Sequence, residues 1–98
     1  MIKILRTAEF DRWLGGLKDR LAKSSVQARI ERLACGNAGD VKAVGEGVSE
    51  MRIHVGAGYR VYFIRVDTAV VLLLCGGSKS SQNRDIARAL EMARILKA

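Results

Sequence analysis

The chain has 98 residues, 49% of them hydrophobic and 28% charged, which is too apolar for a disordered protein and sufficient for one buried core. Lysines and arginines exceed acidic residues by seven charges, and this excess is spread along the whole chain. A basic excess of this kind favours a polyanionic partner, and the length predicts a single domain over residues 1–98.

No stretch of the sequence is typical of a targeting or membrane-spanning segment. The apolar residues at positions 1–5 are too few for a signal peptide, and no apolar run approaches about eighteen residues. Cys35 follows a helical pattern and Cys75 ends an apolar strand, where a thiol serves as a small hydrophobic side chain. We therefore expect both cysteines to be reduced, and a cytoplasmic protein with no membrane partner.

The first third of the chain predicts one strand and two helices. Residues 1–6 have the pattern of a short strand, and Thr7 can cap a helix whose apolar residues follow helical spacing. Gly15 and Gly16 favour an end or a bend in this helix. A second helix is predicted over residues 19–34, with Gly36 as its stop signal and an outer face of Arg20, Lys23, Gln27, Arg29, Glu31 and Arg32.

The middle of the chain predicts a loop with a short edge strand and then a β-hairpin. Residues 36–47 are rich in glycine, which is typical of a loop, but they do not contain a phosphate-binding GxxxxGK[ST] motif. Residues 51–63 alternate on either side of Gly56-Ala57-Gly58, which tolerates the positive φ of a tight turn. One hairpin face is then apolar, with Met51, Ile53, Val55, Val61 and Phe63. The other face gathers Arg52, His54, Arg60 and Tyr62, with no acid among them, and is either a surface for an anion or a solvated sheet face.

The last third predicts a buried strand and a helix. Residues 69–75 are apolar without alternation, which is typical of a strand covered on both faces at the centre of a sheet. A glycine turn at 76–77 leads into a helix capped by Ser80 or Ser81, with an inward face of Ile86, Ala89, Leu90, Ala93 and Leu96. This turn with Lys79 is either an ordinary strand-to-helix connection or a phosphate cradle.

The possible chemistry is narrowed by what the sequence lacks. The sequence contains one histidine and has neither an H-E-x-x-H motif nor paired cysteines, which disfavours a metal site. We expect no cofactor. A Ser-His-Asp site stays open, although no G-x-S-x-G motif is present. The remaining option is cleavage of RNA by its own 2′-hydroxyl, with cations from Arg52, Arg60 and Lys79. His54 is the side chain suited to proton transfer near neutrality, or else a structural histidine of the sheet.

Several local sequences carry a resemblance to a known family. They are FDRWL at 10–14, GNAGDVK at 36–42, VGEGVSEMRI at 44–53, GYRVYF at 58–63 and LLCGGSKS at 73–80. In this order they resemble the RelE/ParE superfamily of bacterial toxins, in the branch of addiction module killer proteins, which is similar to HigB toxins. The resemblance implies an α+β, RelE-like fold, with an N-terminal strand and two helices packed on a mainly antiparallel sheet of four to five strands, and a C-terminal helix.

The resemblance also implies a function and partners. The protein would be the toxin of a type II toxin-antitoxin system, a metal-independent and ribosome-dependent mRNA endonuclease that blocks translation. Its partners would be the ribosome, mRNA and a cognate antitoxin, a small helix-turn-helix protein through which the complex binds operator DNA. The alternatives are a ParE-like inhibitor of DNA gyrase that acts by binding, and a degenerate toxin without catalysis.

Carried over by the resemblance, the catalytic residues would be Arg52, His54, Arg60, Lys79 and Asp85. Residues that contact RNA or the ribosome would be Lys42, Tyr59, Tyr62, Gln82 and Arg84. The sequence departs from several nuclease members because residues 82–98 contain neither an aromatic residue nor a histidine. Either Asp85 or His54 then transfers the proton, or cleavage is weak or absent.

Overall fold

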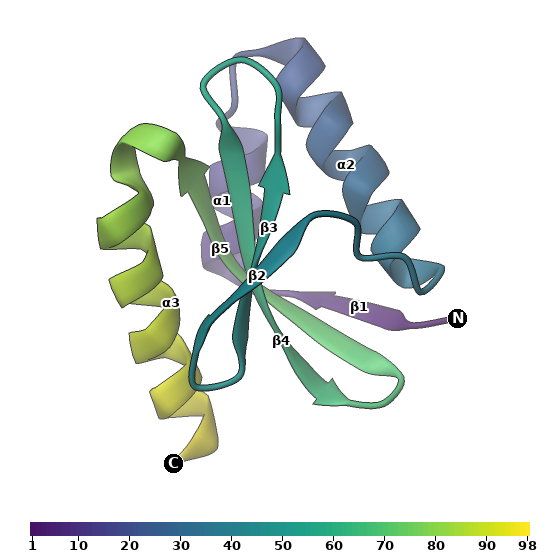
Figure 1. Cartoon of the computed structure of the whole chain (residues 1–98), viewed down its shortest axis with the longest axis vertical. Coiled ribbons are helices and arrows are strands. Elements are labelled where there is room, and N and C mark those ends of the chain that lie inside the picture. Colours follow the sequence, from purple (N-terminus) through teal and green to yellow (C-terminus); the bar gives the residue numbers. More distant parts are fainter.

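A five-stranded sheet forms the middle layer of the computed structural model, which describes residues 1–98 (Figure 1). Three helices cover it, so the α+β class predicted from the sequence is confirmed. The elements in chain order are β1 (Lys3–Arg6), α1 (Ala8–Gly15), α2 (Arg20–Ala34), β2 (Val41–Gly45), β3 (Val48–Ile53), β4 (Tyr59–Asp67), β5 (Val70–Ser78), a 3₁₀ turn (Lys79–Ser81) and α3 (Gln82–Lys97).

The strands are arranged in the order β1-β5-β4-β3-β2. β1 runs parallel to β5, and every other neighbouring pair is antiparallel, as expected for a mainly antiparallel sheet. The prediction that the apolar strand β5 is central was wrong in one respect. β5 is an interior strand between β1 and β4, but β4 occupies the middle position because β3 and β2 extend the sheet on its other side.

The first two helices begin at the residues that the sequence predicts. The Thr7 side chain accepts a hydrogen bond from the backbone N–H of Phe10 at 3.0 Å, and Asp19 accepts one from Ala22 at 3.1 Å. These caps satisfy backbone donors that have no partner within a helix. α1 ends at Gly15, as the glycine pair favours.

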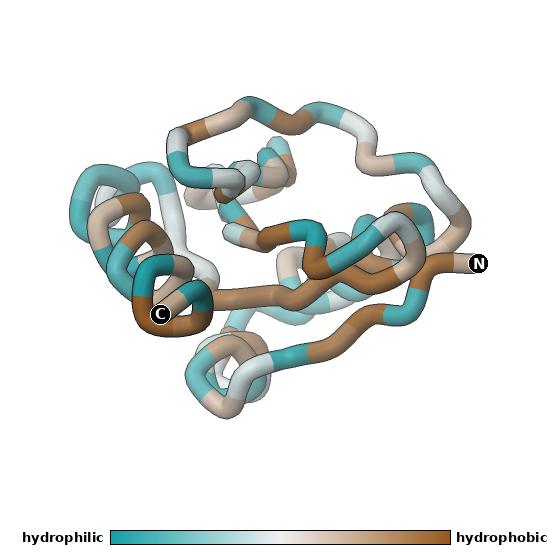
Figure 2. Tube along the Cα trace, turned by 90° about the horizontal axis from the view of Figure 1, so that it is seen from below, coloured by the Kyte–Doolittle hydropathy of each residue, from teal (hydrophilic) through white to brown (hydrophobic).

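The core is divided by the sheet into two hydrophobic clusters. On one face, α1 and α2 pack on the sheet through Phe10, Leu14, Val26, Ile30, Leu33, Met51, Ile53, Val61, Phe63, Val71 and Leu73. On the other face, α3 packs through Val48, Tyr62, Ile64, Leu74, Cys75, Ala89 and Ala93. In Figure 2 the strands through the middle of the molecule are its longest hydrophobic segments. None of the three helices is both long and apolar enough to cross a bilayer.

The helix α3 covers part of the hairpin face that the sequence predicts to be a surface for an anion or a solvated sheet face. The apolar face of the hairpin points to α1 and α2, as predicted, but α3 covers the base of the opposite face. Tyr62 is therefore completely buried and Arg60 is nearly so. Two smaller predictions of burial were also wrong, because Leu96 at the end of α3 and Cys35 at the end of α2 are exposed, and both thiols are free.

The two glycines at positions 76 and 77 lie inside β5, so the predicted glycine turn is wrong. A side chain at Gly76 would overlap the indole ring of Trp13, which packs on one face of the strand. A side chain at Gly77 would overlap the carboxylate of Asp85, which comes from α3 on the other face. Close approach of two helices, and not a turn, explains why this strand contains glycine.

Candidate functional site

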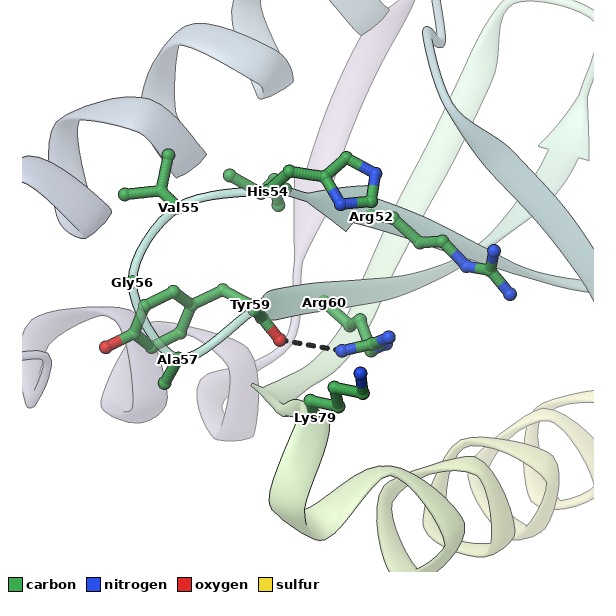
Figure 3. A pocket seen from close by; sticks show the side chains of 10 residues that line it. Arg52, His54, Val55, Gly56, Ala57, Tyr59, Arg60 and Lys79 are labelled. Atoms are coloured by element: carbon green, nitrogen blue, oxygen red, sulfur yellow. Dashed lines mark hydrogen bonds between the residues drawn. The ribbon is translucent and has the colours of Figure 1, made fainter.

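A surface cavity of about 400 Å³ lies at the tip of the β3–β4 hairpin, where the hairpin meets the 3₁₀ turn before α3 (Figure 3). Its lining contains five of the residues that the sequence selected, namely Arg52, His54, Tyr59, Arg60 and Lys79, together with Ile53 and the turn residues 55–58. No acidic side chain is part of this lining. The cavity is therefore suited to an anion.

The backbone of the hairpin tip shapes this cavity. Gly56 and Gly58 have φ values of +53° and +73°, which permit the five-residue connection between the strands. The backbone N–H of Lys79 donates to the carbonyl of Ala57 at 3.3 Å. This bond ties the tip to the end of β5 and brings Lys79 next to Arg60 (Figure 3).

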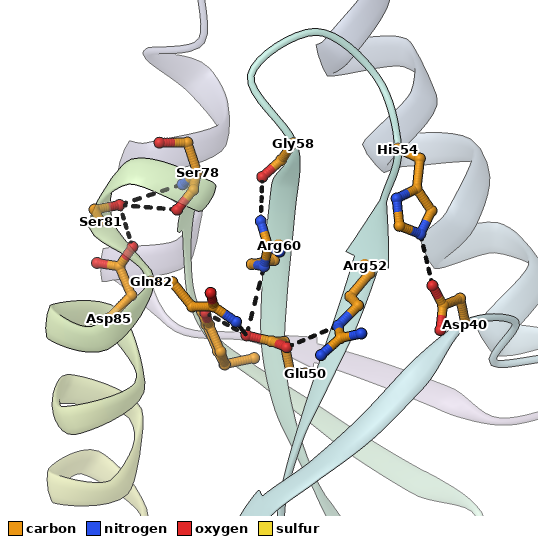
Figure 4. Close-up of polar contacts among 11 residues, drawn as sticks. Asp40, Glu50, Arg52, His54, Gly58, Arg60, Ser78, Ser81, Gln82 and Asp85 are labelled. Atoms are coloured by element: carbon orange, nitrogen blue, oxygen red, sulfur yellow. Dashed lines mark hydrogen bonds and ion pairs between the residues drawn. The ribbon is translucent and has the colours of Figure 1, made fainter.

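The two arginines of the cavity are direct cross-strand neighbours, Arg52 on β3 and Arg60 on β4. The Arg60 guanidinium has two contacts, since its Nη1 donates to the carbonyl of Gly58 at 2.7 Å and its Nε forms an ion pair with a carboxylate oxygen of Glu50 at 3.6 Å, without a hydrogen bond. The Nε of Arg52 donates to the other oxygen of Glu50 at 3.1 Å. One acid thus contacts both arginines (Figure 4).

Glu50 is the residue that sequence reasoning missed on this face. Its side chain is 0% exposed and also accepts hydrogen bonds from the Tyr62 hydroxyl at 2.9 Å and from Gln82 Nε2 at 3.0 Å. Burial raises the pKa of Glu50, but these donors and the charge of Arg60 outweigh it and hold the pKa below its ordinary value. The expectation that the polar face has no acid is wrong.

The burial of Tyr62 also corrects its predicted role in contacting RNA. Burial, and then the hydrogen bond to the Glu50 carboxylate, raise the pKa of the Tyr62 hydroxyl strongly, so this group stays a neutral donor. A side chain with no exposed surface does not reach a ligand in this structure. The strand alternation, which places Glu50 two residues before Arg52 and so on the same face, was a usable signal for Glu50.

His54 forms a pair with Asp40, a second residue that the sequence analysis did not select. The His54 Nε2 lies 2.6 Å from a carboxylate oxygen of Asp40, and this hydrogen bond lowers the pKa of Asp40. The imidazole itself is 72% exposed. Because the bond to Asp40 uses Nε2, the Nδ1 atom is left to exchange a proton with a ligand.

Arg29 positions the loop that carries Asp40, which corrects its assignment to the outer face of α2. Its Nη1 donates to the carbonyl of Arg52 at 2.6 Å and its Nη2 to the carbonyl of Ala38 at 3.0 Å. The backbone N–H of Arg52 donates in turn to the carbonyl of Asp40 at 2.9 Å. The end of β3 and the loop before β2 are therefore fixed to each other and to α2.

The other residues selected from the sequence lie outside the cavity. The Asp85 carboxylate accepts from the Ser81 hydroxyl at 2.5 Å and is directed to β5, so of the two candidates for proton transfer only His54 lines the cavity. Gln82 contacts Glu50 behind the cavity, and Arg84 and Lys42 are exposed elsewhere. No group of three or more His, Cys, Asp or Glu side chains is placed to hold a metal ion.

Comparison with known proteins finds a relative over nearly the whole chain. No protein-family model matches the chain. An uncharacterized protein of Haemophilus influenzae is 48% identical over 95 residues, which cover 97% of this chain and 96% of that protein. The chain belongs to the same family as that protein. At this identity over nearly the full length of both, the relative is expected to share the fold.

The arrangement gives this member of the family a defined chemical capacity. Arg52, Arg60 and Lys79 supply three positive charges on one side of a cavity, and His54 supplies a group that accepts or donates a proton. Cations placed where negative charge develops, together with a positioned base, are the requirements for metal-independent transfer at a phosphodiester. The same set of groups is also suited to binding a phosphate without any reaction.

Proposed function

We propose that the chain is the toxin of a type II toxin-antitoxin system, in the addiction module killer branch of the RelE/ParE superfamily and similar to HigB toxins. In this proposal it is a metal-independent, ribosome-dependent mRNA endonuclease of the cytoplasm. The observation that carries the proposal is the cavity in which three cations and the histidine of a His54–Asp40 pair come together without an acid in the lining. The α+β fold with a mainly antiparallel sheet is compatible with it.

The proposed reaction uses groups that the cavity holds. The 2′-hydroxyl of a ribose attacks the adjacent phosphorus, and the Nδ1 of His54 takes its proton. Arg52 and Arg60 stabilise the negative charge that grows on the phosphate oxygens. As the new O2′–P bond forms, the bond to the 5′-oxygen breaks, and the ammonium group of Lys79 gives that oxygen a proton. The products are a 2′,3′-cyclic phosphate and a free 5′-hydroxyl.

The proposal includes the partners that the family resemblance implies. The ribosome would present the mRNA, and a small helix-turn-helix antitoxin would hold the toxin inactive and bind operator DNA for the complex. The charge of the chain supports a nucleic-acid target, because a net charge of +7 attracts a polyanion over a distance of about a Debye length.

The test is to induce the protein in cells without any antitoxin and to map the 5′ ends of mRNA. His54→Gln and Lys79→Ala remove groups of the cavity whose side chains are exposed, so both variants should fold. We expect new ends confined to translated regions with the wild type, and a loss of cleavage of at least about a hundredfold in His54→Gln, as is typical when a general base is removed. Arg65→Ala is the matched control, because Arg65 is an exposed cation near the far end of β4.

Each outcome of this test decides between the functions. New ends that persist in both cavity variants would refute the cavity as the site. Growth arrest without new ends would refute the nuclease and favour a gyrase inhibitor, which a supercoiling assay would then test. Neither arrest nor new ends would indicate a degenerate toxin. Arg60→Ala is a poor first variant, because it removes a buried partner of Glu50 and changes stability together with activity.

A further inference from the structure

The two arginines of the cavity face each other across the hairpin in an arrangement that is unfavourable by itself. In the register of β3 and β4, Arg52 is opposite Arg60, and Glu50 is opposite Tyr62 on the same face. Like charges directly opposite each other on a sheet repel and destabilise the strand pair. An anion close to both arginines relieves this repulsion, and Glu50 is the one that the chain supplies.

The Glu50 carboxylate is saturated by partners inside the protein. Its Oε1 accepts from Arg52 and its Oε2 accepts from Tyr62 and Gln82, while the Nε of Arg60 lies at ion-pair distance, 3.6 Å, without a hydrogen bond. Since the side chain is 0% exposed, it does not reach a ligand or exchange a proton with one. Its effect on the cavity can only act through the arginines.

The contacts to Glu50 fix the direction of both guanidinium groups. Each arginine turns its Nε toward Glu50, and Arg60 is also anchored by the bond from Nη1 to the carbonyl of Gly58 (Figure 4). The hydrogen bonds of the chain leave both Nη groups of Arg52 and the Nη2 of Arg60 without a protein acceptor. These N–H groups are available to a bound anion, for which a planar guanidinium is suited.

We propose that Glu50 is a positioning residue, which holds the guanidinium groups of Arg52 and Arg60 in the orientation that binds a phosphate in the cavity. That the phosphate belongs to RNA rests on the proposed function, whereas the fixed arginines rest on the geometry alone. The proposal predicts that removing the charge of Glu50 changes the affinity for an anion in the direction opposite to that expected from electrostatics alone. Removing a buried negative charge beside a cationic cavity strengthens anion binding by Coulomb's law, but losing the positioning weakens it.

The first experiment measures the order of the arginine side chains in the wild-type protein. Nitrogen-15 relaxation of the Nε–H groups reports motion on the picosecond to nanosecond timescale. We expect the Nε of Arg52 and Arg60 to be nearly as ordered as the backbone, and the Nε of the exposed Arg65 to be mobile. Arg52 and Arg60 signals as mobile as that of Arg65 would overturn the proposal without the need for any variant.

The second experiment measures anion binding by Glu50 variants. The probe is a fluorescein-labelled, single-stranded RNA with 2′-O-methyl groups, which cannot react, and binding is followed by fluorescence anisotropy. Glu50→Gln should bind about tenfold more weakly than the wild type, as the loss of one charged hydrogen bond implies. Glu50→Asp keeps the charge but is one methylene shorter, so it should also bind more weakly and lower the order of both arginines.

The matched control is Glu31→Gln, which makes the same chemical change on the exposed side of α2. It should bind the RNA at least as tightly as the wild type. Thermal melting identifies any variant that does not fold. If Glu50→Gln does not fold, RNA binding by Glu50→Asp and the relaxation of the wild-type arginines test the positioning role. A folded Glu50→Gln or Glu50→Asp that binds the RNA as tightly as the wild type, or more tightly, would overturn the proposal.

The experiments distinguish a wrong positioning role for Glu50 from a wrong proposed function. If the wild type cuts no mRNA but the Glu50 variants loosen the arginines and lose RNA binding, then the nuclease is refuted and the positioning role stands. If the wild type cuts mRNA and a folded Glu50→Gln keeps ordered arginines and full binding, then the positioning role is refuted and the nuclease stands.

Discussion

The two tyrosines of the chain form a matched pair for testing the buried network around Glu50. Tyr62 is 0% exposed and its hydroxyl donates to the Glu50 carboxylate at 2.9 Å. Tyr59 is half-buried beside the cavity, and its hydroxyl makes no hydrogen bond within the chain. Tyr62→Phe removes one oxygen and leaves the ring in place, so the change isolates the hydrogen bond.

The expected cost of Tyr62→Phe follows from the contacts that remain. Glu50 keeps its hydrogen bonds from Arg52 and Gln82, so its charge is still partly compensated. A hydrogen bond to a charged group contributes about 1.5–3 kcal/mol, and we expect a loss of about 2 kcal/mol in the free energy of unfolding. For a domain of this length, that loss lowers the melting temperature by about 10 °C.

Urea unfolding followed by circular dichroism measures both variants. The urea concentration at the midpoint of unfolding should be lower for Tyr62→Phe than for the wild type. The slope of the unfolding free energy against urea should stay unchanged, because the surface exposed on unfolding is the same. Tyr59→Phe should stay within about 0.5 kcal/mol of the wild type. Equal stabilities of the two variants would refute the assignment of Tyr62 to a buried hydrogen bond.

Three further predictions follow from the same structure. The pKa of Glu50 lies below its ordinary value of 4.5 in the folded chain, so the unfolded chain binds more protons in acid. The free energy of unfolding should therefore fall as the pH drops below about 4.5, and it should fall less steeply in Glu50→Gln. Urea unfolding between about pH 3 and 6 measures this dependence. Gly76→Ala should destabilise by about 1–3 kcal/mol because of overlap with an indole ring, whereas Gly15→Ala, which meets open space in α1, should not destabilise. Burial raises the pKa of the Cys75 thiol to about 12, so at pH 8 a thiol reagent should label only the exposed Cys35, and labelling of two thiols per folded chain would contradict this burial.

Local patterns in the sequence determined most of the elements. The caps at Thr7 and Asp19, the stop at Gly15 and the turn at Gly56–Gly58 depend on neighbours within four residues, and all are found in the structure. The alternation of the hairpin also assigned the correct face to the core, because the period of a strand places alternate residues together whatever packs on them.

The candidate site was predictable only in part, for a physical reason. The sequence brought Arg52, His54 and Arg60 to one face through strand alternation and added Lys79 as a third cation next to the last strand, and the structure groups these side chains around one cavity. Which polar residues on that face stay exposed depends on α3, which is distant in the sequence. Its position buries Tyr62, and its first residue contributes a hydrogen bond to the buried Glu50.

The sequence by itself determined most of the elements, the cap of the first helix, the α+β class and the basic face of the hairpin, since these depend on local spacing and composition. The predicted cap of the last helix was wrong in part, because Ser81 precedes α3 but its side chain makes no capping hydrogen bond. Only the tertiary structure decided that Glu50 contacts both arginines, that Asp40 pairs with His54, and that Gly76 and Gly77 make room for two helices. Apart from the Glu50–Arg52 pair, which lies within β3, each of these contacts joins different segments of the chain. Their distances depend on how the layers pack, which a single sequence does not encode as a local pattern.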